Sequence, residues 1–173
     1  MVTVFLILIN IIFYFTVPYN YYSLFGLNIL FFKKDAFWQI ASALFLHANL
    51  THLILNMIVL FQFGKILENC LGSFKFCLLY ITGGLLCSFL SACYIYFIFL
   101  TSNEFVNVVG ASGVICVLMG YYAVLDANSL KGLFIVVMLM SFVPLLMGIN
   151  VAWYAHIFGF ICGFILAKLK EKR

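Results

Sequence analysis

The stretch FKFCLLYITGGLLCSFLSACYIYFIFL, residues 74–100, decides the fold class of this chain. Lys75 is its one charged residue, and aliphatic and aromatic side chains fill most of its length. One crossing of the hydrocarbon core of a bilayer takes about 20 residues of α-helix. We therefore expect this stretch to form a membrane-spanning helix.

The rest of the chain has the same character. Hydrophobic residues make up 67% of it, charged residues 8%, and the mean hydropathy is +1.23. Soluble domains carry roughly 25% charged residues, so a water-soluble fold is excluded. The apolar runs lack the alternation of barrel strands, which leaves helices as the structure that pairs backbone groups in lipid. The sequence predicts a single all-α membrane domain over residues 1–173, a bundle of six transmembrane helices at about 2–17, 40–63, 74–100, 113–125, 130–147 and 151–169.

The positive charges indicate the topology. If the N-terminus is cytoplasmic, seven basic residues lie on the inner side and two, Lys33 and Lys34, on the outer side, which agrees with the positive-inside rule. Both termini are then expected in the cytoplasm. The first run has no basic segment before it and no small-residue cleavage site after it, so we expect a retained span. The basic residues form no patch with interleaved aromatics, and no nucleic-acid partner is expected.

The cysteines point to no metal or disulfide chemistry. There are six, none in a CxxC pair, and most lie within apolar runs, where they behave as small hydrophobes. We expect no disulfide, no metal site and no cofactor.

Three polar clusters interrupt the apolar runs, and polar groups within spans usually mark function. The first follows His47 at the outer end of the second run. Asn49, His52 and Asn56 have i, i+3, i+7 spacing and therefore share one helix face. His47 lies off that face, and we expect its side chain to bond backbone or loop groups.

The second cluster is Gly110-Ala111-Ser112-Gly113, at the start of the short fourth run. A helix N-terminus offers free backbone N–H donors and the positive end of the helix dipole, which can stabilise an oxyanion on a substrate carbonyl. When this cluster is taken alone, an ordinary N-terminal serine, with glycine present for helix packing, is the better explanation, because such patterns of small residues are common in membrane helices.

The third cluster, in the last run, contains His156, Gly159 and Gly163. The two glycines form a GxxxG face that lets another helix approach closely, and His156 lies on much the same face. Gly113 and Gly120 give the fourth run a matching smooth stripe beside Ser112. Close packing of these two helices would bring Ser112 and His156 within hydrogen-bond reach, the arrangement that nucleophilic catalysis requires.

The three clusters together resemble the rhomboid intramembrane proteases. The resemblance rests on His47-x4-His52-x3-Asn56, then Gly110-Ala111-Ser112-Gly113, then Ala155-His156-x2-Gly159-x3-Gly163, and it covers essentially the whole chain. It includes Trp38, nine residues before His47, and Glu68 to Gly72 in the following loop. Six spans are the minimal core of that family.

The resemblance implies roles for individual residues. Ser112 would be the nucleophile and His156 its base, with an oxyanion hole made by the side chains of His52 and Asn56 and the backbone N–H of Ser112. Gly110, Gly113, Gly159, Gly163 and His47 would support the site. The implied function is a serine endopeptidase that cleaves transmembrane helices of single-pass proteins in the bilayer, without metal or cofactor. The compact core and the absence of a transit peptide, rather than the resemblance, predict a bacterial inner membrane as the location, with the active site open to the outer side.

Two departures from the family pattern stand out. Cys116 occupies the position four residues after the serine, where the family usually has an aromatic that stacks on the catalytic histidine; Trp153, Phe158 or Phe160 would have to compensate. Gln39 replaces the usual Arg after Trp38, which affects only a loop contact to lipid headgroups.

Two other functions remain open at this point. Cys116 keeps open a catalytically inactive rhomboid-like protein that binds membrane helices without cleavage. A transporter or metal carrier that uses His47, His52 and His156 would need carboxylates in the spans, and the sequence has none there.

Overall fold

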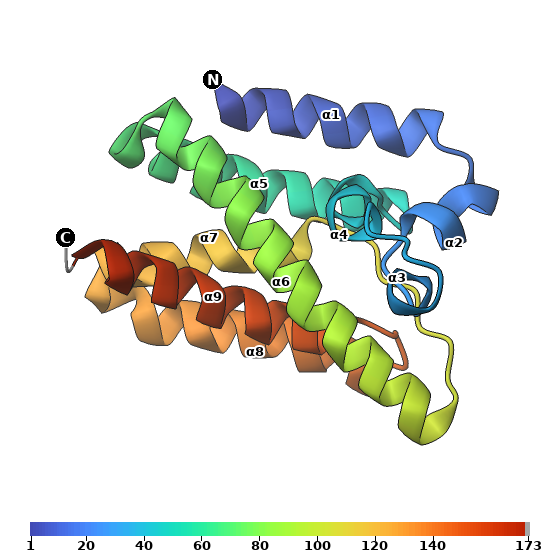
Figure 1. Ribbon diagram of the computed structural model, residues 1–173. Helices are drawn as coiled ribbons and strands as arrows, with labels where there is room; N and C mark the ends of the chain where they lie inside the picture. Colours follow the sequence, from blue (N-terminus) through green and yellow to red (C-terminus); the bar gives the residue numbers. More distant parts are fainter. Residues whose placement is uncertain (172–173) are drawn as a thin grey trace.

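The computed structural model describes residues 1–171, and most of these residues are helical (Figure 1). The long helices are α1 (Val2–Thr16), α5 (Leu50–Leu71), α6 (Ser73–Ser102), α7 (Ser112–Leu125), α8 (Leu130–Leu146) and α9 (Trp153–Glu171). The short ones are η1 (Tyr19–Tyr21), α2 (Tyr22–Phe25), α3 (Leu30–Lys33), α4 (Gln39–Ser42), η2 (Ala43–Phe45) and η3 (Ala127–Ser129). Strand-like pairing within residues 1–171 is limited to one bridge between Leu27 and Val108. The all-α fold expected from the sequence is confirmed.

The long helices alternate in direction along the chain, and α6 runs obliquely across its neighbours (Figure 1). The start of α1 and the end of α9 therefore lie toward the same end of the molecule. α7 is the central helix: it packs against α5, α6, α8 and most extensively α9. Ten of its residues are buried, from Gly113 to Tyr121 and Ala123. The protein thus encloses the short helix that begins at Ser112.

Four helical segments within the described residues are long and apolar enough to cross a bilayer: α5, α6, α8 together with η3, and α9. A fifth is reached if α1 and the η1–α2 segment, which meet at 106°, count as one broken span. α7 has 14 residues, about 21 Å of helix against a hydrocarbon core of about 30 Å. The structure therefore supplies four to five spans by length and composition, and the sixth in the sequence prediction is this short inner helix.

The second predicted span, 40–63, is wrong at both ends. The helix starts at Leu50, because the Asn49 side chain accepts a hydrogen bond from the His52 backbone N–H at 2.8 Å and caps it. The helix continues to Leu71. The predicted end at residue 63 had been placed before the charged residues Lys65 and Glu68, which the helix in fact includes. Residues before the cap fold into α4 and η2 instead. The other predicted spans lie within two residues of the observed helices.

Glu68 joins the start of α1 to the end of α5. One carboxylate oxygen accepts hydrogen bonds from the Val2 backbone N–H at 2.7 Å and the Ser73 hydroxyl at 2.6 Å. The other accepts from the Thr3 N–H at 3.0 Å and the Thr3 hydroxyl at 2.7 Å. These donors satisfy a carboxylate that is only 5% exposed, and they cap the free N–H groups of α1.

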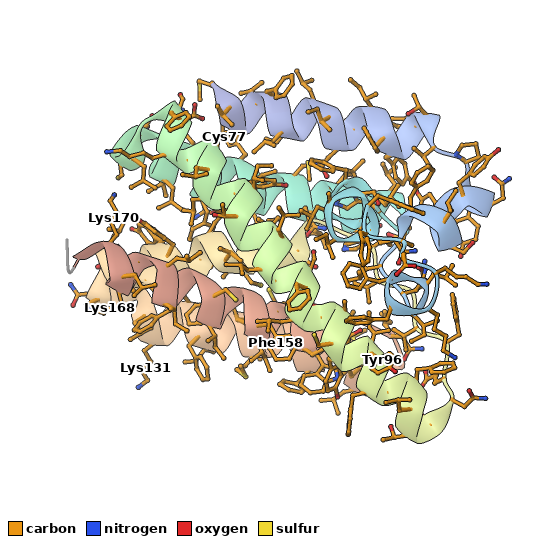
Figure 2. The ribbon with its side chains drawn as sticks, viewed as in Figure 1. Cys77, Tyr96, Lys131, Phe158, Lys168 and Lys170 are labelled. Atoms are coloured by element: carbon orange, nitrogen blue, oxygen red, sulfur yellow. The ribbon has the colours of Figure 1, made fainter. Side chains whose placement is uncertain are left out.

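Basic side chains gather at one end of the bundle. Lys131, Lys168 and Lys170 lie near the turn into α8 and the end of α9 (Figure 2). Lys33, in the segment between α1 and α5, instead lies over the Phe99 ring at 3.8 Å, near the other end of α6. The charges are thus distributed unequally between the two ends of the helices.

Candidate functional site

The segment before α7 is tied to the loop region that follows α1. Leu27 and Val108 exchange backbone hydrogen bonds of 2.9 and 2.8 Å, and the Gly110 N–H donates to the Ala43 carbonyl at 2.9 Å. Gly110 has φ +129°, a conformation that favours glycine. These contacts fix the backbone from which α7 starts. Ser112 lies in the first turn of this helix, where backbone N–H groups have no partner within the helix itself.

Glycines allow α7 and α9 to pack backbone against backbone. A Cβ at Gly159 would lie 2.2 Å from the Gly113 carbonyl oxygen, and one at Gly163 would lie 1.9 Å from the Val117 carbonyl oxygen. From the other side, a Cβ at Gly120 would lie 2.0 Å from the Phe160 carbonyl oxygen. No larger residue fits these positions without separating the two helices.

This packing brings the predicted pair together. His156 Nε2 lies 3.1 Å from Ser112 Oγ, a hydrogen-bond distance. His156 is 4% exposed, and the carbonyl of the preceding residue, Ala155, accepts a hydrogen bond from the Cys87 thiol at 3.2 Å. A serine with an imidazole at this distance has the geometry of an activated nucleophile.

His52 and Asn56 converge on the backbone just before Ser112. A Cβ at Gly110 would lie 2.7 Å from His52 Cε1 and 3.6 Å from Asn56 Nδ2, so these two side chains pack directly on the glycine. Within residues 1–171, Asn56 Nδ2 is buried without a hydrogen-bond partner. A buried amide with a free donor is costly unless another group completes it. The two side chains and the first turn of α7 therefore face one small region.

His47 lies behind His52. Its ring packs edge-on against the His52 ring, with centroids 5.2 Å apart, and its backbone carbonyl accepts a hydrogen bond from the Tyr22 hydroxyl at 3.1 Å. Burial, and to a lesser degree the neighbouring His52, lowers the pKa of His47 from 6.5 to about 4. His47 is consequently neutral near pH 7, and it fills space beneath His52. Within residues 1–171 both of its ring nitrogens are buried without a partner at hydrogen-bond geometry, so the expected bond from this side chain to backbone or loop groups is not formed.

A small cavity adjoins Ser112. The first residues of α7 line it together with Ser88 and Ser91 of α6 and apolar residues of the loop region. It has room for about one water molecule. His52, Asn56 and His156 are not among its lining residues.

The sequence prediction missed one polar contact of His156. Ser141 of α8 is fully buried, and its Oγ lies 3.1 Å from His156 Nδ1. The available signal in the sequence was a lone serine within the apolar stretch 132–147. Cys116 Sγ is 3.9 Å from Met140 Sδ.

The aromatic side chains expected to compensate for Cys116 have other partners. Trp153 and Phe158 pack against Tyr94, and Phe160 packs against Phe134. Trp153 also stacks on Phe142.

Comparisons with known proteins identify the family of this chain. The family model of the Rhomboid domain matches residues 34–173. The Bacillus subtilis (strain 168) protein named "Putative rhomboid protease YdcA" is 34% identical over 148 residues, which cover 79% of this chain and 70% of that protein. The Arabidopsis thaliana "RHOMBOID-like protein 4" is 33% identical over 149 residues, or 78% of this chain and about a third (34%) of the plant protein. With its apolar helices, the chain is an integral membrane protein that belongs to the rhomboid family.

Proposed function

We propose that this protein is an intramembrane serine endopeptidase that cleaves transmembrane helices of single-pass membrane proteins with a dyad of Ser112 and His156. The observation that carries the proposal is the 3.1 Å contact between Ser112 Oγ and His156 Nε2 in the interior of a membrane protein. His156 is buried and Ser112 is half-buried. Polar groups placed inside an apolar bundle are costly, and they usually mark a functional site.

The chemistry follows from the positions of the groups. His156 Nε2 accepts the Ser112 proton while Ser112 Oγ attacks the scissile carbonyl carbon of the substrate. The carbonyl oxygen of the substrate then becomes negatively charged. The Ser112 N–H and the side chains of His52 and Asn56 form the oxyanion hole, and the free Asn56 Nδ2 donor supports this role. His156 then donates its proton to the leaving amine. Water hydrolyses the acyl-enzyme, and the cavity beside Ser112 offers room for one molecule.

The fold suggests how a membrane substrate is used. We propose six transmembrane helices, with α7 as a short inner span that does not face lipid, both termini in the cytoplasm of a bacterial cell, and the site open to the outer side. A substrate helix has its carbonyls bonded within the helix, so its outer end must unwind before attack. Substrates with helix-weakening residues, entering laterally between α5 and α8, meet this requirement.

Labelling with a fluorophosphonate in detergent tests the nucleophile directly. The parent is expected to be labelled, and Ser112→Ala and His156→Ala to lose labelling while they retain the parent's melting temperature. Ser102→Ala is the matched control, because Ser102 is an exposed serine at the end of α6. Labelling that survives in Ser112→Ala contradicts the assignment.

Cleavage of a reconstituted single-pass substrate distinguishes a protease from a catalytically inactive rhomboid-like protein. An inactive rhomboid-like protein that binds membrane helices would co-purify with the substrate helix and leave it intact in proteoliposomes. Cys116, in place of an aromatic, is the residue in this chain that favours the alternative. Parent protein that cleaves the substrate, together with Ser112→Ala that binds without cleaving, supports the protease.

A further inference from the structure

We propose that Ser141 is a positioning residue for His156, which selects the imidazole tautomer that can deprotonate Ser112. The inference rests on the proposed function and deepens it. Ser141 lies on α8, the helix before the one that carries His156. It is the third member of a hydrogen-bonded chain with His156 and Ser112.

The contacts of Ser141 fix the direction of its hydrogen bonds. Its Oγ lies 2.6 Å from the Val137 carbonyl oxygen, one helical turn earlier, and 3.1 Å from His156 Nδ1. A serine hydroxyl has one proton, and a carbonyl can only accept. The Ser141 proton is therefore directed at Val137, and Ser141 Oγ is left as an acceptor.

The imidazole must then present a donor to Ser141. The proton of neutral His156 lies on Nδ1, and the lone pair of Nε2 points at Ser112 Oγ. In this tautomer Nε2 can accept the Ser112 proton. The opposite tautomer would place a proton on Nε2, where it would donate to Ser112 and could not act as its base.

A bond from a buried serine to the carbonyl four residues earlier is common in membrane helices and has no functional meaning by itself. It accounts for the contact with Val137 only. It does not account for a fully buried hydroxyl oxygen within hydrogen-bond distance of the one imidazole that also contacts Ser112. The second contact connects α8 to the dyad.

The same contact strengthens as the reaction proceeds. When His156 accepts the Ser112 proton it becomes an imidazolium, and its Nδ1–H bond to Ser141 becomes charge-assisted. A bond that is stronger in the transition state than in the ground state accelerates the reaction. Because Cys116 offers no ring to stack on His156, this hydrogen bond supplies orientation to the imidazole that a stacked aromatic would otherwise give.

The test combines labelling rates with the state of the histidine ring. We expect Ser141→Ala to lower the second-order rate of fluorophosphonate labelling by about tenfold, which corresponds to the difference between a charge-assisted and a neutral hydrogen bond. Ser141→Thr should recover most of the rate because the hydroxyl is kept. Thr82→Val is the matched control: Thr82 of α6 makes the same kind of bond, to the Leu78 carbonyl at 2.7 Å. Its removal should leave the rate unchanged.

Nitrogen-15 NMR reports which ring nitrogen of His156 carries the proton. A purely structural role of Ser141 would not change this tautomer. The chain has three histidines, and His156→Ala assigns the signal of interest. In the neutral parent we expect a protonated Nδ1 and a bare Nε2, with a mixture of tautomers in Ser141→Ala. This measurement on the parent decides the question even if Ser141→Ala fails to fold.

The two proposals fail in different ways. A parent that is folded but unlabelled at Ser112 overturns the proposed function. A labelled parent whose His156 is protonated at Nε2, or a Ser141→Ala variant labelled at the parental rate, overturns the role of Ser141 alone.

Discussion

Alanine at Gly159 should separate the dyad without removing either member. A Cβ there would lie 2.2 Å from the Gly113 carbonyl oxygen and 3.0 Å from Cys116 Cβ. Real Cβ atoms stay at least 3.0 Å from such neighbours, so α7 and α9 must part by about 0.8 Å. Because Ser112 adjoins Gly113 and His156 lies one turn before Gly159, the Oγ to Nε2 distance should grow from 3.1 to about 3.9 Å. That distance no longer supports a hydrogen bond.

The expected loss of activity is large and the loss of stability moderate. General base catalysis contributes about 10²–10⁴-fold, and most of it should disappear in Gly159→Ala. Overpacking of this size typically costs about 1–3 kcal/mol, so we expect the variant to fold. The assay is the fluorophosphonate labelling rate beside the melting temperature in the same detergent.

Gly132→Ala is the matched control, since a Cβ at Gly132 meets no atom within 4 Å. Its labelling rate should equal that of the parent. A folded Gly159→Ala protein that is labelled as fast as the parent would refute the claim that close packing of α7 and α9 positions the dyad.

Three further predictions follow from other contacts. Asn56→Ala should slow labelling by about 10²–10³-fold with little change in melting temperature, as for loss of one oxyanion donor; an unchanged rate would remove Asn56 from the oxyanion hole. Glu68→Ala should lower the free energy of unfolding by about 3 kcal/mol, because four donors lose their acceptor; equal stability of Glu68→Ala and the exposed control Glu104→Ala in detergent melts would contradict it. His47 is neutral when folded, with a pKa of about 4 against about 6.5 when unfolded, so the unfolded chain binds more protons between these values. Stability should fall by up to about 3 kcal/mol as the pH drops from about 6.5 to about 4, and less in His47→Gln; melting curves that fall equally in both proteins would disprove this contribution.

Composition and apolar run length determined the fold class, because lipid leaves helices as the solution for such runs. Helix ends were harder to predict where a cap decides them. The apolar residues 40–49 are similar in hydropathy to those that follow, yet Asn49 starts a new helix by accepting the His52 N–H. Lys65 and Glu68 suggested an end for α5, but Glu68 is buried by bonds to α1, which the local sequence does not contain.

The glycine pattern was the informative part of the site prediction. Spacing in Gly159 and Gly163 indicated a close helix contact, and with Gly113 and Gly120 it identified which helix approaches. The contact of Ser141 with His156 was not predictable in the same way, because it depends on the rotation of α8 against α9. A single serine in an apolar run gives no sign of which neighbour it meets.

Mass mapping of the fluorophosphonate adduct tests the central claim most directly. The parent, labelled in detergent and digested, should carry one adduct, on the peptide that contains Ser112, and labelling should require an intact His156. An adduct on any other serine, or a folded protein with no adduct at all, would contradict the claim that these two residues form a nucleophile and its base.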